Sequence, residues 1–219
     1  MPARVSETYV LRTYPFRESD LIVSFFTRDQ GKLRGVARRA RKPKSSFGSG
    51  LERLSLVNLS YSQKETRELV NLNSCDLLQS QFDLLERFEA SVALDYVAEV
   101  SEHMLPPSEP NERFFRLLVV TLGYMHERTP GCIWAAITYF SLWATRLSGF
   151  LPDLAIHPDR SLSSSSRDLA GAMLRAHIGD LPTLAWNRDT ALDLRRFLIR
   201  EMEQHVERRF HTPALLEGL

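Results

Sequence analysis

The sequence is poor in residues that would build a disulfide framework or a cysteine-rich metal site. Only Cys75 and Cys132 occur among 219 residues, which excludes a disulfide-stabilised scaffold and a four-cysteine zinc site. The N-terminal stretch MPARVSETYV lacks the apolar core of a signal peptide. The longest uncharged apolar stretch, between Arg128 and Arg146, is shorter than the roughly 20 residues of a membrane helix. We therefore expect a cytoplasmic protein in which this stretch forms a buried core helix.

The signatures of common enzyme classes are also missing. There is no GxxxxGKS/T phosphate-binding loop, no GxGxxG dinucleotide fingerprint and no HExxH zinc motif. The six histidines show no other metal-ligand spacing, and neither cysteine belongs to a recognisable catalytic group. We expect no catalytic site, no metal and no cofactor.

The charge is unevenly distributed along the chain, although the formal net charge is only +1. Residues 1–80 hold 14 Lys+Arg and 8 Asp+Glu, whereas residues 81–219 hold 14 Lys+Arg and 19 Asp+Glu. The first part is therefore +6 and the second −5. A basic front and an acidic back predict two modules with different partners. We place the modules at residues 1–78 and 79–219.

The first module is predicted to consist of short strands separated by turns. The predicted strands are Thr8–Arg12, Leu21–Thr27, Lys32–Ala37, Leu54–Tyr61 and Glu68–Leu72. Asp29-Gln30-Gly31 predicts a tight turn, and the alternation of Val57, Leu59 and Tyr61 with polar residues predicts a half-buried strand. Five short strands can close into a small barrel, of the OB or the SH3-like type. Their spacing does not distinguish the two.

The second module is predicted to be helical, because from Ser80 onward apolar residues recur at steps of three and four. The predicted helices are one from Ser80 to Pro106 whose apolar face includes Phe82, one capped by Asn111, a central one at Cys132–Leu147 ended by Gly149, one over Asp168–His177, and one over Asp189–Phe210. The serine cluster at Leu162–Ser166 is predicted to be a loop. The fold class is therefore α+β, with a five-stranded OB-like barrel followed by an all-helical domain.

A basic segment is the main chemical signal. Between Gly31 and Ser45 lie seven cations and no acid: Lys32, Arg34, Arg38, Arg39, Arg41, Lys42 and Lys44. Such a run repels itself unless a polyanion is near, and phosphates that exchange their counterions for these cations would supply one. We predict that Arg38–Lys44 is a mobile DNA-binding loop at the end of a strand. The alternative is a solvated basic loop that binds nothing.

Aromatic residues interleave with this basic segment, as in small barrels on which bases stack. The candidates are Tyr9, Tyr14, Phe16, Phe25, Phe26 and Tyr61. Most are expected to belong to the core. Tyr14 and Phe16 are predicted to be partly exposed, and we assign Tyr14 to the DNA-binding set.

Several segments, in order, resemble one family. They are YVLR at Tyr9–Arg12, ESDLIV at Glu18–Val23, FTRDQGKL at Phe26–Leu33, VARRAR at Val36–Arg41, KSSF at Lys44–Phe47, Leu51-Glu52, and GFLPDL at Gly149–Leu154. This pattern resembles the RecO family of bacterial DNA repair and recombination proteins. The resemblance is most specific over roughly residues 5–55.

The resemblance implies an N-terminal OB fold and a helical C-terminal domain. It implies binding of single- and double-stranded DNA, annealing of complementary strands, and help in loading recombinase onto strands coated by single-strand-binding protein. The implied protein partners are RecR and the acidic C-terminal tail of the single-strand-binding protein. The candidate tail-binding residues are Arg113, Arg116, Arg128 and Arg146.

The sequence departs from the family pattern in the basic segment and after the PDL motif. Arg38-Arg39 stands where the family has Lys-Gly, which keeps charge but loses a glycine. Many members carry a four-cysteine zinc module where this chain has His157–Arg160 and serines, so we expect no zinc. Two other functions remain open: a protein–protein adaptor without DNA binding, and an RNA-binding OB protein.

Overall fold

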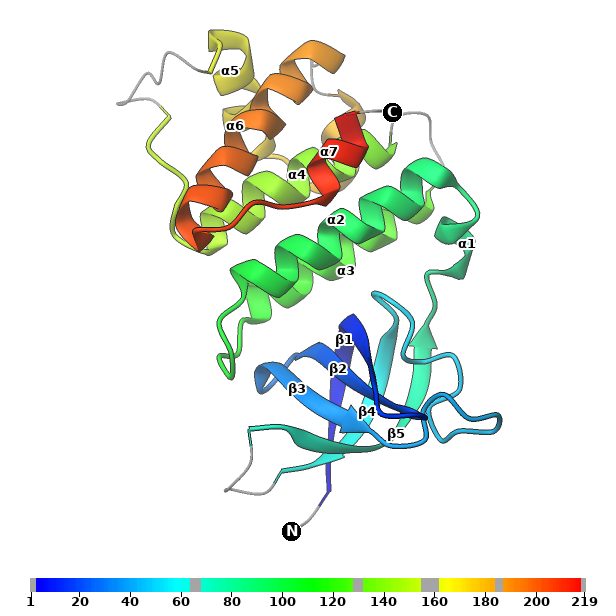
Figure 1. Cartoon of the computed structure of the whole chain (residues 1–219). Coiled ribbons are helices and arrows are strands. Elements are labelled where there is room, and N and C mark those ends of the chain that lie inside the picture. The colour runs from blue at the N-terminus through cyan, green and yellow to red at the C-terminus, as the bar shows by residue number, and fades with distance from the viewer. Residues whose placement is uncertain (1–2, 64–67, 128–131, 155–161, 184–186, 218–219) are drawn as a thin grey trace. The chain divides into compact units, whose positions relative to one another are not determined.

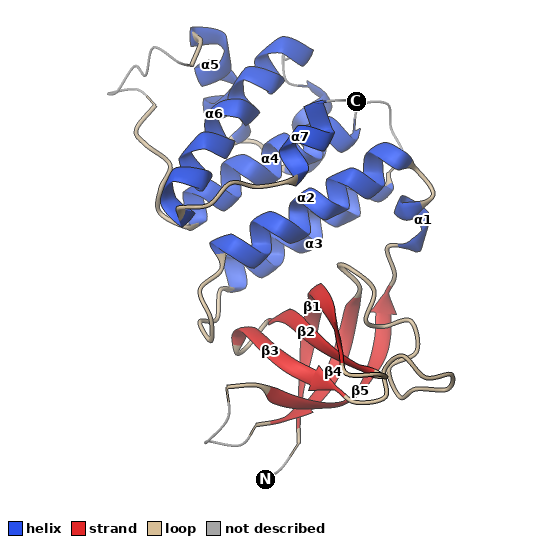
Figure 2. Cartoon of the chain, in the orientation of Figure 1, coloured by secondary structure: helices blue, strands red, loops and turns tan. Residues whose placement is uncertain are grey.

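The computed structural model describes residues 3–63, 68–127, 132–154, 162–183 and 187–217. Within these ranges five strands precede the helices along the chain (Figure 2). The α+β class predicted from the sequence is confirmed.

The strands form a closed barrel in the order β1-β2-β3-β5-β4 (Figure 1). Their bounds are β1 Arg4–Phe16, β2 Asp20–Thr27, β3 Gly31–Ala37, β4 Leu56–Ser62 and β5 Val70–Gln79. Neighbouring strands are antiparallel except for β3 and β5, which are parallel. The predicted OB-like barrel is thereby confirmed.

Two local features explain how so few strands close. The long strand β1 pairs with β4 through its first half and with β2 through its second, and the register shifts between Val10 and Arg12. Such a bulge bends the strand and increases its twist.

In β4, Val57, Leu59 and Tyr61 are buried inside the barrel while the residues between them are half-buried, as the alternation predicted.

The turn into β3 requires a glycine. Gly31 has φ +75°, and a Cβ placed there would lie 2.2 Å from the backbone oxygen of Glu109. Both the left-handed backbone and the close approach exclude a side chain. The predicted Asp29–Gly31 turn is present.

The chain divides into two compact units, and the division does not follow the order of the elements. The first unit comprises Met1–Arg87 and Leu94–Phe115, and the second comprises Phe88–Ala93 and Arg116–Leu219. The barrel thus shares its unit with α1 (Phe82–Leu85), most of α2 (Phe88–Met104) and the first turn of α3 (Glu112–His126).

An aromatic cluster holds the first unit together. The ring centroids of Tyr9 and Phe115 lie 5.1 Å apart, and Phe26 lies 6.1 Å from Phe114 and 5.8 Å from Phe115. All four side chains are buried. Aromatic residues that the sequence associates with base stacking therefore serve packing between the barrel and α3.

The second unit is built around α4, Cys132–Leu147, which has the predicted bounds. Twelve of its residues are buried, and α6 (Arg188–Val206) packs against both α4 and α5 (Ser164–Met173). The remaining elements are the 3-10 helix η1 (Ile178–Thr183) and α7 (Thr212–Glu217). No helix in the described ranges is long and apolar enough to cross a membrane.

Four predicted helix features are wrong. The helix expected from Ser80 is interrupted, because Arg87 is extended between α1 and α2, and Phe82 is 65% exposed. The serine cluster is no loop: Ser163 caps α5 by accepting the Ser166 N–H, and α5 ends at Met173. The last helix stops at Val206 because Glu207 adopts a left-handed conformation. The predicted break at Pro130-Gly131 lies outside the described residues.

Three predicted strands have different bounds in the structure. β1 spans Arg4–Phe16, four residues beyond each end of the predicted Thr8–Arg12. The strand expected over Leu54–Tyr61 begins at Leu56, after turn residues. β5 continues to Gln79, well past the predicted end at Leu72. Its second half includes Leu77 and Leu78, but both side chains are exposed and no alternation marks the segment as a strand. Pairing with β4 nevertheless extends to Gln79.

Candidate nucleic-acid interface

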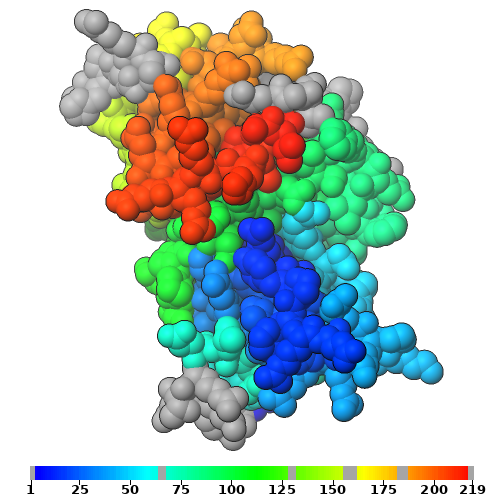
Figure 3. Space-filling model, in the orientation of Figure 1, coloured from blue at the N-terminus to red at the C-terminus, as the bar shows by residue number. Residues whose placement is uncertain are grey.

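The segment after β3 carries five exposed cations. They are Arg38, Arg39, Arg41, Lys42 and Lys44. This segment extends away from the strands (Figure 1), and it forms part of the barrel surface in Figure 3. None of the ion pairs among the described residues involves these five side chains. They therefore present uncompensated positive charge to solvent.

The basic segment is anchored to the barrel at both ends. The backbone N–H of Arg39 donates to Asp20 Oδ1 at 2.8 Å, and that of Arg41 donates to the Ser19 oxygen at 3.1 Å. Farther along, Phe47 and Leu51 are buried in the barrel core. The segment predicted to be a mobile loop is therefore joined to the corner between β1 and β2.

Cys75 lies under this anchored segment. Its thiol donates to the Phe47 oxygen at 3.2 Å, and burial, helped by Asp76, raises its pKa to about 11. Because the thiolate is the reactive form, the raised pKa lowers the reactivity of Cys75 at neutral pH.

Three basic residues near this corner adopt left-handed backbone conformations. Their φ angles are 54° at Arg17, 56° at Arg39 and 62° at Lys44. A non-glycine residue in this region costs about 1–2 kcal/mol. Arg39 occupies the position at which the family that this sequence resembles carries glycine. This chain therefore has a strained backbone at a residue with a positively charged side chain.

Arg39→Gly is expected to separate stability from binding. Relief of backbone strain offsets the added freedom of glycine in the unfolded chain, so the free energy of unfolding should stay equal or rise by up to about 1 kcal/mol. Loss of one phosphate contact should weaken DNA binding severalfold and reduce its salt dependence. Urea unfolding and fluorescence anisotropy measure the two effects. A variant that binds DNA as tightly as wild type would remove Arg39 from the interface.

The two cations on β3 contact one buried residue, Glu102: Arg34 reaches its carboxylate and Lys32 its backbone oxygen. Glu102 on α2 is 4% exposed; it accepts from Arg34 Nη2 at 2.9 Å and from Ser24 Oγ at 2.5 Å, and its backbone oxygen accepts from Lys32 Nζ. Burial lowers the pKa of Lys32, whereas the hydrogen bond to Glu102 raises that of Arg34. Lys32 and Arg34 therefore differ from the other five cations, because Arg34 forms an ion pair with Glu102 and Lys32 is hydrogen-bonded to a backbone oxygen.

The aromatic candidates divide as the sequence predicted. Tyr9, Phe25, Phe26 and Tyr61 are buried, whereas Tyr14 and Phe16 near the end of β1 are half-buried. The guanidinium carbons of Arg12 and Arg17 each lie 5.2 Å from a ring centroid, over Tyr14 and Phe16 respectively. Arginine planes beside partly exposed rings are a common surface for stacking bases.

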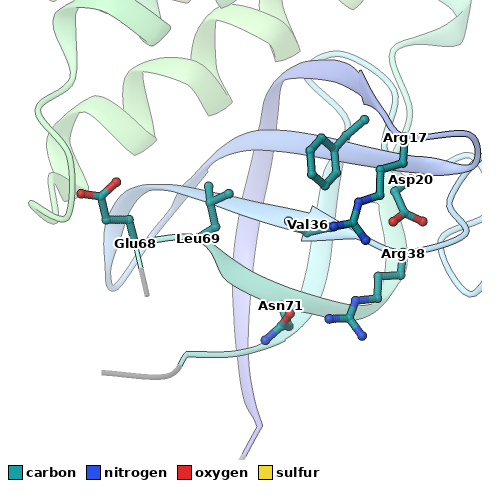
Figure 4. Close-up of a pocket in the computed structure, with 8 residues that line it drawn as sticks. Arg17, Asp20, Val36, Arg38, Glu68, Leu69 and Asn71 are labelled. Atoms are coloured by element: carbon teal, nitrogen blue, oxygen red, sulfur yellow. The ribbon is translucent and has the colours of Figure 1, made fainter. Parts of the chain in front are cut away.

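A cavity of about 370 Å³ opens beside Phe16. Its lining residues come from the β1–β2 corner, from β3 and from the beginning of β5: Phe16, Arg17, Asp20, Val36, Arg38, Glu68, Leu69 and Asn71. Figure 4 shows Arg17 and Arg38 at one end of the cavity and Glu68 at the other. OB folds bind oligonucleotides with this first corner and the loop before the fifth strand.

The candidate tail-binding arginines are distributed over both units. Arg113 and Arg116 are exposed on α3, Arg146 is exposed at the end of α4, and Arg128 lies outside the described residues. In the second unit, Arg146 and Arg167 line a cavity of about 720 Å³ with Leu151, Leu154 and Leu174. Asp153 and Asp168 also line it, so its rim carries both signs of charge. The expected zinc-free segment His157–Arg160 lies outside the described residues.

Sequence reasoning missed several residues of these sites, among them Arg17, Arg167 and Glu102. Arg17 lies in the sequence between Phe16 and the acidic residues Glu18 and Asp20. A cation next to an aromatic residue was the signal that could have identified it. Arg167 and Glu102 had no such signal. Glu102 reaches Arg34 across 68 positions of the chain, a contact that only the tertiary fold creates.

Comparison with known proteins gives family matches for the barrel and for the first part of the helical region. A family model described as "Recombination protein O N terminal" matches residues 1–81, and one described as "Recombination protein O C terminal" matches residues 85–156. A DNA repair protein RecO of Koribacter versatilis is 40% identical over 242 aligned residues, covering 98% of each chain. DNA repair proteins RecO of Syntrophus aciditrophicus and Thermodesulfovibrio yellowstonii are 29% and 31% identical; their alignments cover 68% of this chain and 57% and 58% of those proteins.

Proposed function

This chain belongs to the RecO family of DNA repair proteins, and from that membership we propose that it binds single- and double-stranded DNA, anneals complementary strands and helps to load recombinase during homologous recombination. The observation that carries the proposal is the group of five exposed cations that form no ion pair among the described residues, anchored to the corner of an OB-like barrel. These are Arg38, Arg39, Arg41, Lys42 and Lys44, and we add Tyr14 on β1, whose ring is half-buried.

The mechanism follows from charge and needs no catalytic step. Two DNA strands repel each other through their phosphates, and a basic surface that replaces condensed counterions lowers this repulsion. Base readout by the protein is unnecessary, because complementary strands select each other. Lys32 and Arg34 belong to the proposed surface, but their contribution is smaller because Arg34 is paired with the Glu102 carboxylate and Lys32 donates to the Glu102 backbone oxygen.

We further propose that the helical unit receives the acidic tail of the single-strand-binding protein. The cavity lined by Arg146 and Arg167 offers cations beside apolar Leu151, Leu154 and Leu174. An acidic peptide with an apolar end needs this combination, since charge-assisted hydrogen bonds orient it and the apolar pocket retains it. Asp153 and Asp168 line the same cavity, and their charge repels the tail's carboxylates. Arg113, Arg116 and Arg128 stay separate candidates for contacts with the tail, and RecR is proposed as a second partner on family membership alone.

The test is annealing of complementary oligonucleotides, bare and coated with single-strand-binding protein, at low and raised salt. We expect the protein to accelerate annealing on both substrates, with an effect that fades as salt rises. Folded protein that accelerates neither reaction would contradict the proposal. Such protein, if it still captured its protein partners, would be the adaptor considered above, and a preference for RNA strands would indicate the RNA-binding alternative.

A further inference from the structure

The cavity beside Phe16 combines three features that suit one unpaired nucleotide. Its volume of about 370 Å³ is near the lower limit of ligand pockets, which suits a single small ring system. One aromatic ring, that of Phe16, lines it together with the apolar side chains of Val36 and Leu69. Asn71 adds an amide that can both donate and accept hydrogen bonds.

The charged residues at the two ends of the cavity would orient a bound nucleotide. Arg17 and Arg38 lie at one end, and Glu68 lies at the other (Figure 4). A phosphate is attracted to the two guanidinium groups and repelled by the carboxylate. The base of the same nucleotide then lies toward Leu69 and Asn71, and Glu68 can accept from an N–H group on a base edge.

The free state of the cavity is compatible with base insertion. The guanidinium carbon of Arg17 lies 5.2 Å from the Phe16 ring centroid, an exposed cation–π contact. Contacts of this kind are weaker than stacking of a base on an aromatic ring, so a base can displace the guanidinium. The left-handed φ of 54° at Arg17 shows that the corner holds this cation at a cost in backbone strain.

We infer that this cavity binds one unstacked base of single-stranded DNA, with Phe16 as the stacking surface and with Arg17 and Arg38 on the adjoining phosphate. The inference rests on the proposed DNA binding and names the part of the strand that the barrel recognises. A paired base cannot enter, because its faces are stacked within the duplex. The cavity therefore favours single strands, whereas the five cations after β3 bind phosphates of any strand.

The experiment compares two single strands of equal length, one of thymidylates and one of abasic residues, by fluorescence anisotropy. Both carry the same phosphates, so wild-type protein should prefer the strand with bases by about tenfold. Phe16→Leu should bring this ratio close to one while leaving affinity for the abasic strand unchanged, which also shows that the variant is folded. The matched control is Phe82→Leu, at a phenylalanine that is 65% exposed on α1 and distant in sequence from the cavity residues.

A third oligonucleotide tests whether the cavity binds only one base, and this test uses the wild-type protein alone. It carries a single fluorescent 2-aminopurine among abasic residues. We expect this one base to recover most of the affinity difference, and its fluorescence to fall when wild-type protein binds. Affinity that instead rises evenly with each added base would overturn the inference, as would an unchanged ratio in Phe16→Leu or an equal loss in Phe82→Leu. Absence of binding to either strand would refute the proposed DNA binding itself.

Discussion

Changing Arg38, Arg39 and Arg41 together to alanine is expected to weaken binding of single-stranded DNA on the order of a hundredfold at low salt, because three phosphate contacts are lost. All three side chains are exposed and outside the ion pairs of the described residues, so no internal partner compensates for their removal. The slope of log affinity against log salt should fall by about 2, at about 0.7 for each contact on single strands. Titrations at several salt concentrations measure both quantities.

The control for this triple variant removes equal charge elsewhere. Arg175, Arg188 and Arg209 are exposed arginines of the helical unit. Changing these three to alanine alters net charge by the same amount, and we expect little change in the salt slope. If the two triple variants lost affinity equally, binding would reflect net charge rather than a surface on the barrel. An unchanged slope in the first variant would exclude the basic segment as the DNA site.

Glu102→Ala is expected to lower the free energy of unfolding by about 2–3 kcal/mol, the largest effect on stability that we predict. The carboxylate is 4% exposed and accepts from Ser24 on β2 and Arg34 on β3. Its removal leaves the buried hydroxyl of Ser24 without its acceptor. The Arg34 contact contributes less, because that side chain is 57% exposed and solvent screens the pair.

Urea unfolding measures this effect, and two further variants show its origin. Ser24→Ala alone should destabilise, but Ser24→Ala combined with Glu102→Ala should cost less than the sum, because both remove the same hydrogen bond. Glu109→Ala is the control, since Glu109 is an exposed acidic residue in the same unit. Additive effects of Ser24→Ala and Glu102→Ala would contradict a direct bond of this strength.

Much of the fold could be predicted from local patterns. The alternation in β4, the Asp29–Gly31 turn and the apolar helix Cys132–Leu147 each record burial within a few neighbouring residues, and each has the predicted form. The prediction of one helix from Ser80 was wrong, because the periodicity of apolar residues shows only which side chains could share a buried face. It does not show that the backbone is extended at Arg87 or that Phe82 is exposed.

The sequence predicted which residues of the candidate site are present, but not which partners they have in the fold. The sequence identified the seven cations and the partial exposure of Tyr14 and Phe16, because charge density and position in a strand are local properties. It could not separate Lys32 and Arg34 from the other five cations, since their partner Glu102 is brought to β3 by packing of α2 within the same unit.

The sequence by itself therefore determined the barrel-then-helix order, the family and the basic segment, all of which depend on contiguous residues. The tertiary structure decided which cations remain available, where the basic segment is anchored, and which residues surround the cavity beside Phe16. Phe16, Arg38 and Asn71 meet there because β1, β3 and β5 close into one barrel. Strand pairing over long sequence separations sets that geometry, and no pattern within a short window of the chain records it.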